Sequence, residues 1–183
     1  MAKDIIIGID PSLNSTGICV KNDQKYKYYN ITTKKTKKME EFSSNYINLC
    51  FVDKPNMTNL PYSEKEYQKS YNIYHILEHI KQILKKHKPI HVIMEGLSYG
   101  SNGQLGDLGG LNYAIRMILI QLNIPFTIVP PTSWKKQLLG NAGADKDIIV
   151  ETWKKLDKNI KNIQSIKLDD LADAYFLSNY QFN

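Results

Sequence analysis

Short apolar runs separated by turn residues dominate the first part of the chain. Residues 4–9 form a β-branched run that is typical of a central strand buried on both faces. Residues 16–20 and 25–33 predict two further strands, and the tight connections between the three predict an antiparallel meander. Residues 45–53 could add another strand, which the pattern leaves undecided.

Helical periodicity begins after residue 61. Ser63, with Glu66 three residues later, has the spacing of a capping box, so we expect an amphipathic helix from Ser63 to about His87. The remaining predicted elements are strands 91–95 and 126–129 and helices 107–122, Thr132 or Ser133 to Leu139, 145–156 and 168–180. Together these elements predict an α/β fold with a mixed five-stranded sheet and helices on both faces.

Length and charge narrow the class of protein. A chain of 183 residues without a proline- or glycine-rich linker is expected to form a single domain. A net charge of +6 suits a polyanionic partner, although abundant solvating lysine explains it equally well. No apolar run approaches the roughly 18 residues of a membrane span, and the start of the chain lacks the layout of a signal peptide. We therefore expect a cytoplasmic protein without a membrane partner, and thiols at Cys19 and Cys50 that bind no metal.

Acidic residues stand where apolar runs end. Asp10 follows the first strand, Glu95 ends the fourth, and Asp170 and Asp173 lie three apart in the last helix, on one side of it. Asp169 is expected to face solvent, and the alternative is a shift by one residue that makes Asp169 the ligand instead of Asp170. Buried carboxylates repel one another and lose hydration, so a bound divalent cation is the common reason for such a set.

Each acid also has a structural explanation. Asp10 could cap turn amides, Glu95 could form an ion pair, and the two helical aspartates could lie on a solvated face. The joint case is stronger. If the first and fourth strands are neighbours, Asp10 and Glu95 lie side by side, and the last helix would bring its acids to the same place.

Four motifs, in order, resemble the RuvC-like Holliday junction resolvases of the RNase H-like nuclease superfamily. They are Ile7-Gly8-Ile9-Asp10-Pro11-Ser12 with Thr16-Gly17, Val92-Ile93-Met94-Glu95, Trp134 to Gly140 with Ala144-Asp145-Lys146, and Asp170-Leu171-Ala172-Asp173-Ala174. The chain departs from that pattern by an insertion at about 34–64 and by Tyr99 where the family has a phenylalanine after the glutamate. A lysine-, isoleucine- and asparagine-rich composition is typical of AT-rich phage or viral genomes.

The resemblance implies a metal-dependent nuclease that cuts branched DNA. Asp10, Glu95, Asp170 and Asp173 would be the metal ligands, with two Mg²⁺ ions per active site and Mn²⁺ as a substitute. Lys146 would join these acids as a catalytic residue by stabilising charge on the phosphate.

Further roles follow from the same resemblance. Substrate would be bound by Lys135, Ser12 and Tyr99, the last by stacking on an unpaired base. A homodimer is expected through the second long helix, where Gly109, Gly110 and Ala114 would allow close approach. The alternative is that these glycines only pack the helix onto the sheet.

Other functions remain open on sequence grounds. An RNase H or a flap-type nuclease would use the same fold on another substrate. A non-catalytic nucleic-acid-binding module is disfavoured because all four acids are present. An actin-like ATPase is disfavoured because the chain has no glycine-rich adenosine motif near its C-terminal end.

Overall fold

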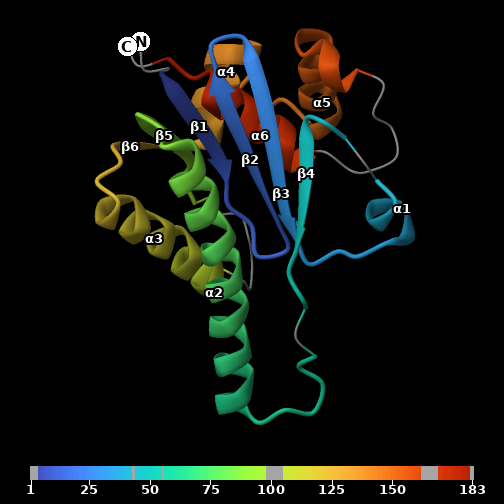
Figure 1. Ribbon diagram of the computed structural model, residues 1–183, viewed down its shortest axis with the longest axis vertical. Helices are drawn as coiled ribbons and strands as arrows, with labels where there is room; N and C mark the ends of the chain where they lie inside the picture. The colour runs from blue at the N-terminus through green and yellow to red at the C-terminus, as the bar shows by residue number, and fades with distance from the viewer. Residues whose placement is uncertain (1–3, 43, 55, 98–104, 162–168, 182–183) are drawn as a thin grey trace.

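The computed structural model describes residues 4–42, 44–54, 56–97, 105–161 and 169–181 (Figure 1). The strands are β1 Ile5–Asp10, β2 Ser15–Asn22, β3 Lys25–Thr32, β4 Ile47–Phe51, β5 His91–Glu95 and β6 Phe126–Val129. The helices are α1 Lys37–Glu40, α2 Tyr62–His87, α3 Leu105–Gln121, α4 Pro131–Leu139, α5 Lys146–Leu156, the 3₁₀-helix η1 Lys158–Ile160 and α6 Asp169–Ser178. None of the helices in these ranges combines the length and apolarity needed to cross a membrane.

Within the described residues the sheet has six strands in the order β4-β3-β2-β1-β5-β6. The β1-β2-β3 meander is antiparallel, whereas β5 pairs in parallel with β1, and β6 with β5, as the sequence predicts. The predicted number of five strands is wrong because β4 joins the edge of the sheet, parallel to β3. Its side chains after Ile47 are only half-buried, which explains its weak sequence pattern.

Helices cover both faces of the sheet, as predicted, and each face has its own core. Ile7 and Ile9 of β1 pack with residues of α2 and α3 such as Ile80 and Ile115. The opposite face packs with α4, α5 and α6 through buried side chains such as Trp134, Trp153 and Leu177. In Figure 1, α2 and α3 lie in front of the sheet, and α4, α5 and α6 lie behind it.

Helix α6 lies unusually close to the sheet at two glycines. A Cβ atom at Gly8 of β1 would overlap the carbonyl oxygen of Ala174, and one at Gly17 of β2 would overlap that of Asp170. Glycine inside a strand lowers strand stability, so its presence here is explained by this approach of another backbone. The two glycines therefore determine how near α6 comes to β1 and β2.

Two helix starts differ from the prediction, and each lies at a proline. Helix α2 begins at Tyr62 with Pro61 as its N-cap residue, so Ser63 is not its cap, and α4 begins with Pro131 rather than at Thr132 or Ser133. Pro131 suits the first turn of α4 because its missing N–H would be unpaired there.

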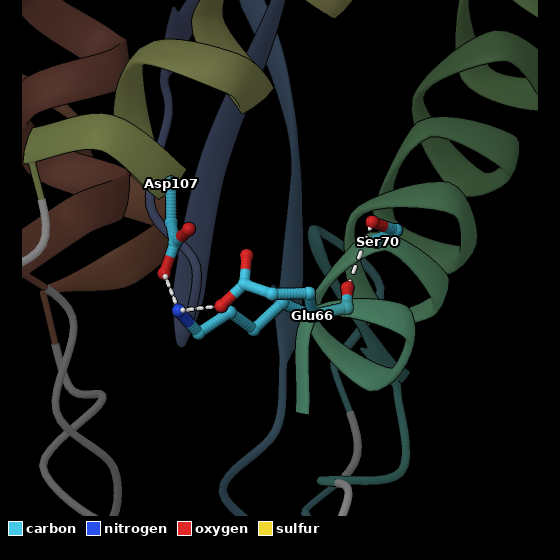
Figure 2. Close-up of polar contacts among 4 residues, drawn as sticks. Glu66, Ser70 and Asp107 are labelled. Carbon is cyan, nitrogen blue, oxygen red and sulfur yellow. Dashed lines mark hydrogen bonds and ion pairs between the residues drawn. The ribbon is translucent and has the colours of Figure 1, made fainter. Parts of the chain in front are cut away.

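Glu66 has a different role from the predicted capping box. Its carboxylate lies 2.8 Å from the Lys69 ammonium, which also lies 3.3 Å from Asp107 of α3 (Figure 2). The Ser70 hydroxyl donates a hydrogen bond of 2.9 Å to the backbone carbonyl of Glu66. The lysine thus links α2 to the first turn of α3, and Glu66 pairs with it instead of capping its own helix.

Replacing Gly8 by alanine should destabilise the protein by roughly 1–3 kcal/mol or more, because the new methyl group forces α6 away from β1. Gly106→Ala is the matched control, since a Cβ atom at this helical glycine meets no atom within 4 Å. That control should be neutral or stabilise by up to about 1 kcal/mol. Urea denaturation of the three proteins measures both effects, and equal stability of Gly8→Ala and the wild type would contradict the close approach.

Candidate metal centre and its surroundings

Asp10 and Glu95 are brought together by the parallel pairing of β1 and β5. Ile9 lies opposite Met94 in this register, so the next residue on each strand is one of the two acids. Side chains alternate along a strand, and Ile9 and Met94 both belong to the core under α2 and α3. Asp10 and Glu95 therefore lie on the other face, which α6 covers.

Asp173 of α6 adds the third carboxylate. One oxygen from each of Asp10, Glu95 and Asp173 lies within 4.8 Å of the other two. Asp170, one turn earlier on α6, is not part of this cluster, and the Ser15 hydroxyl is its hydrogen-bond partner. Three of the four predicted ligands therefore come together. The fourth, Asp170, lies on α6 one turn before Asp173.

The cluster is electrostatically unfavourable without a cation. Burial, followed by the negative charge of Glu95, raises the pKa of Asp10 well above that of a free aspartate. The same two causes raise the pKa of Asp173 to about 7, while nearby Lys135 and Lys146 lower it. Burial first, and repulsion from neighbouring carboxylates second, therefore raise the pKa of Asp10 and Asp173 and favour their protonated forms.

The donor set of the cluster fits a hard divalent cation. Oδ1 of Asp173 is buried and has no hydrogen-bond partner among the described residues. Three carboxylate oxygens converge there, and Mg²⁺ and Mn²⁺ take oxygen ligands. A cation would supply the missing partner of Asp173 and neutralise the mutual repulsion.

Trp134 and Asn112 hold Glu95 in place, and sequence reasoning did not assign either of them a role. The buried indole of Trp134 donates a hydrogen bond of 3.2 Å to Oε1 of Glu95 and stacks on Phe176 of α6. Nδ2 of Asn112 donates a hydrogen bond of 3.1 Å to the backbone carbonyl of Glu95. A tryptophan at the start of a helix after a proline pair was the available signal, but its partner depends on how α4 docks.

The two candidate lysines lie close to the acids. Nζ of Lys146 donates a hydrogen bond of 2.7 Å to Oδ2 of Asp169. Asp169 is buried, with an exposed fraction of 6%. The prediction that Asp169 faces solvent is therefore wrong, because the first turn of α6 turns this residue toward α5. Nζ of Lys135 lies 5.5 Å from the centre of the Trp134 ring and donates to the carbonyl of Ala144 at 3.4 Å.

Ser12 lies in the turn that follows Asp10. Its backbone N–H donates to Oγ1 of Thr16 at 3.0 Å, and its side-chain oxygen accepts a longer bond of 3.4 Å from the N–H of Asn14. These contacts give Ser12 a role in shaping the turn, and its predicted contact with substrate stays a prediction. Tyr99 lies outside the described residues, so its predicted role also stays a prediction.

A pocket opens beside two of the acids. It is lined by Asp10, Pro11, Glu95, Gly96, Leu97, Leu108, Asn112 and Pro131. The pocket lies where the ends of β1 and β5 meet α3 and the start of α4, and Asp173 is not among its lining residues.

The fold matches solved structures of resolvases. The Thermus thermophilus RuvC structure aligns with a TM-score of 0.59 and 16% identity, covering 95% of this chain and 90% of that chain. T. thermophilus RuvC in complex with a Holliday junction substrate aligns with a TM-score of 0.59 and 17% identity over the same shares, 95% and 90%. The fowlpox virus resolvase in complex with substrate Holliday junction DNA gives a TM-score of 0.51 and 13% identity, covering 96% of this chain and 94% of that chain.

No family model matches the sequence, and no curated protein sequence matches it. The likeness is one of structure at low sequence identity. The predicted RuvC-like resolvase fold is confirmed by these alignments.

Stability without divalent ions should fall as pH rises from about 4 to 8. Asp173 has a folded-state pKa of about 7, whereas a free aspartate has about 3.9, so the folded protein binds this proton more tightly. The contribution of the protonated Asp173 carboxyl to the free energy of unfolding is fully present below about pH 4 and is lost as pH rises through about 7. Asp173→Asn should therefore exceed the wild type in stability at pH 8, by an amount on the order of 1–4 kcal/mol.

Urea denaturation in EDTA at several pH values measures this difference. The gap between Asp173→Asn and the wild type should shrink toward pH 4, where the wild-type carboxyl is protonated. Asp4→Asn is the control, because Asp4 is exposed just before β1, and its gap should not change in this way. A gap of constant size for Asp173→Asn would contradict the charge repulsion inferred for the cluster.

Proposed function

We propose that this protein is a divalent-metal-dependent, structure-specific endonuclease that resolves four-way (Holliday) or other branched DNA junctions by paired phosphodiester hydrolysis. The observation that carries the proposal is the meeting of Asp10, Glu95 and Asp173 within 4.8 Å on a RuvC-like fold. Further support comes from the two similar proteins that were solved with Holliday junction DNA. The net charge of +6 suits a polyanionic substrate.

The proposed cofactor is Mg²⁺, with Mn²⁺ as a substitute. Asp10, Glu95 and Asp173 would hold it, and Asp170 would extend the ligand set to a second ion. When bound, such ions lower the pKa of water and neutralise charge on a phosphodiester. Asp10 comes from the central strand β1, between the acids of β5 and α6, which makes it the residue best placed to serve both ions.

The chain's own residues position the substrate and the acids. Lys146 would place its positive charge near the scissile phosphate, because Asp169 holds its ammonium at the edge of the cluster. Trp134 donates a hydrogen bond to Oε1 of Glu95 and so restricts the rotation of this carboxylate. Oε2 of Glu95 would then be the oxygen that binds the cation. Lys135, Ser12 and Tyr99 are proposed to contact the DNA around the cut site.

The substrate distinguishes this proposal from its rivals. An RNase H would prefer an RNA–DNA hybrid, a flap nuclease would prefer a single branch, and a non-catalytic module would bind without cutting. One gel with labelled four-way junction, flap and hybrid substrates in Mg²⁺, Mn²⁺ or EDTA separates all of these. Symmetric cuts in the junction alone, absent in EDTA, are the expected result.

A homodimer through α3 would provide two active sites for paired cuts. A Cβ atom at Gly109 would lie 3.8 Å from Leu97, and one at Gly110 would lie 3.9 Å from Ile73, which are ordinary van der Waals distances. The dimer role of these small residues and the alternative that they only pack the helix therefore both stay predictions. The outer side of α3 exposes Tyr113, Met117 and Ile120, with exposed fractions of 58%, 49% and 55%.

These three apolar residues follow helical spacing and form one stripe, which we define as the α3 stripe. Exposed apolar stripes of this kind are typical of surfaces that bind a partner. Two copies of a stripe can pack against each other about a two-fold axis, and a junction with two-fold symmetry calls for such a pair. We therefore propose the α3 stripe as the dimer surface.

Asp10→Asn should lower junction cleavage by roughly 100-fold or more, because the substitution removes a central ligand. DNA binding should persist, since basic groups supply most of the affinity for DNA. Asp4→Asn is the matched control, because Asp4 is exposed just before the other end of β1, and it should cleave like the wild type. Gel assays of cleavage and fluorescence anisotropy of binding measure the two properties, and activity within a few-fold of wild type would refute the ligand assignment.

Met117→Glu should convert the dimer to a monomer, because the carboxylate would be buried against its own copy at the α3 stripe. The variant should still nick one strand but lose paired incision of the junction. Ile90→Glu is the control, with a similar exposed fraction of 51% away from α3. Light scattering measures the mass of each protein, and a monomeric wild type, with and without DNA, would refute the dimer.

A further inference from the structure

A second charged site lies at the C-terminal end of α5. Here a cleft is lined by Lys154, Lys155, Lys158 and Lys161 together with Glu151. We call these residues the α5 lysine cleft. Four lysines and one glutamate therefore line the same concave surface.

The positive charge of this cleft is not neutralised by nearby acids. Across the described ranges, none of its four lysines lies in an ion pair. Asp157 lies between them in sequence, but it is buried and accepts hydrogen bonds from the Tyr28 hydroxyl at 2.6 Å and from the N–H of Asn159 at 3.0 Å. The cleft therefore keeps a positive potential that attracts anions.

Compensation of the helix dipole explains only part of this cluster. Lysines in the last turn of a helix are favourable near its carbonyl groups, which accounts for Lys154 and Lys155. Lys158 begins η1 and Lys161 follows it, so both lie beyond the end of α5. Their convergence on the same cleft indicates a ligand outside the helix.

A buried polar network fixes the backbone that carries these lysines. The Trp153 indole donates to the Tyr28 hydroxyl at 3.0 Å, and that hydroxyl donates in turn to Asp157. Trp153 and Ile160 are fully buried, so α5 and η1 are both anchored to the β3 face. An anchored backbone reduces the entropy that the site loses when a ligand binds.

The cleft lies one helix length from the candidate metal centre. Lys146, which begins α5, contacts Asp169 beside the acids, and the cleft lies at the other end of the same helix. Ten residue steps of 1.5 Å give about 15 Å between the ends of α5. At 3.4 Å per base pair this corresponds to roughly four or five base pairs of duplex DNA.

We propose that the α5 lysine cleft binds the phosphate backbone of a DNA duplex arm, roughly four or five base pairs from the cut phosphate. This inference rests on the proposed nuclease function and adds a second, non-catalytic contact that holds the arm. The cleft contributes affinity without base specificity, because ammonium groups read only the phosphates.

The test compares two triple variants that each remove three lysines. The cleft variant, Lys154→Gln/Lys155→Gln/Lys158→Gln, lacks three of the four positive charges of the cleft. The control variant, Lys85→Gln/Lys86→Gln/Lys88→Gln, lacks three at the exposed C-terminal end of α2. Both sets are placed in the Asp10→Asn background so that a labelled four-way junction stays intact. Binding is then measured between 50 and 200 mM KCl, and circular dichroism checks that each variant is folded.

Loss of two or three phosphate contacts should reduce the salt dependence of binding in the cleft variant alone. At about −0.9 in log–log slope per contact, the wild-type affinity should fall roughly 10- to 40-fold more than that of the variant over this salt range. Equal slopes for the cleft variant and the wild type, or an equal change in the α2 control, would overturn the proposal.

Neutral methylphosphonate linkages locate the contact. Placed roughly three to six base pairs from the cut phosphate, they should weaken binding by the wild-type cleft and leave the cleft variant unaffected. Equal weakening of both proteins would overturn the proposed position. Low-salt junction cleavage by proteins with Asp10 intact tests the nuclease function separately, since the cleft variant should still cut there.

Discussion

The contact between the α6 backbone and the glycines of β1 and β2 is the constraint on which the site depends. Gly8 lies two residues before Asp10 on the same face of β1, and Gly17 pairs with Asp10 across the meander. Both lack a Cβ atom where α6 carbonyl groups approach. A side chain at either position would lift α6 and carry Asp173 away from Asp10 and Glu95. The spacing of the three carboxylates is therefore determined by backbone packing, before any cation contributes to it.

This packing has to oppose the repulsion within the cluster. The buried face of α6 includes Leu171, Phe176 and Leu177, and burial of such side chains stabilises by about 1.5–3 kcal/mol each. Against this stand the carboxylates, two of which have raised pKa values because they are buried beside Glu95. The core thus holds charges together that would separate in a freely moving chain. Stored repulsion of this kind is typical of functional sites, where local preference and function conflict.

The sequence predicted those features that depend on local pattern. Strand ends located Asp10 and Glu95, and helical spacing located Asp173, because periodicity reports which residues are buried. Asp169 was expected to face solvent but is buried and paired with Lys146, since the rotation of α6 about its axis depends on its contacts with β2 and α5. Trp134 could not be assigned to Glu95, because the bond requires α4 to dock on the sheet. Strand β4 was undecided because an edge strand buries little, and only its pairing with β3 identifies it.

The position of α6 in the chain has a consequence for the newly made protein. Asp10 and Glu95 precede it, and every strand of the described sheet is complete before α6 is synthesised. Synthesis proceeds from the N-terminus, so a nascent chain passes through a stage with two of the three clustered acids and an uncovered sheet face. Until α6 docks, the sheet face at Gly8 and Gly17 lacks the helix that covers it in the folded protein. A fragment that ends before α6 therefore has Asp10 and Glu95 but neither Asp173 nor the backbone packing that sets the spacing of the three carboxylates.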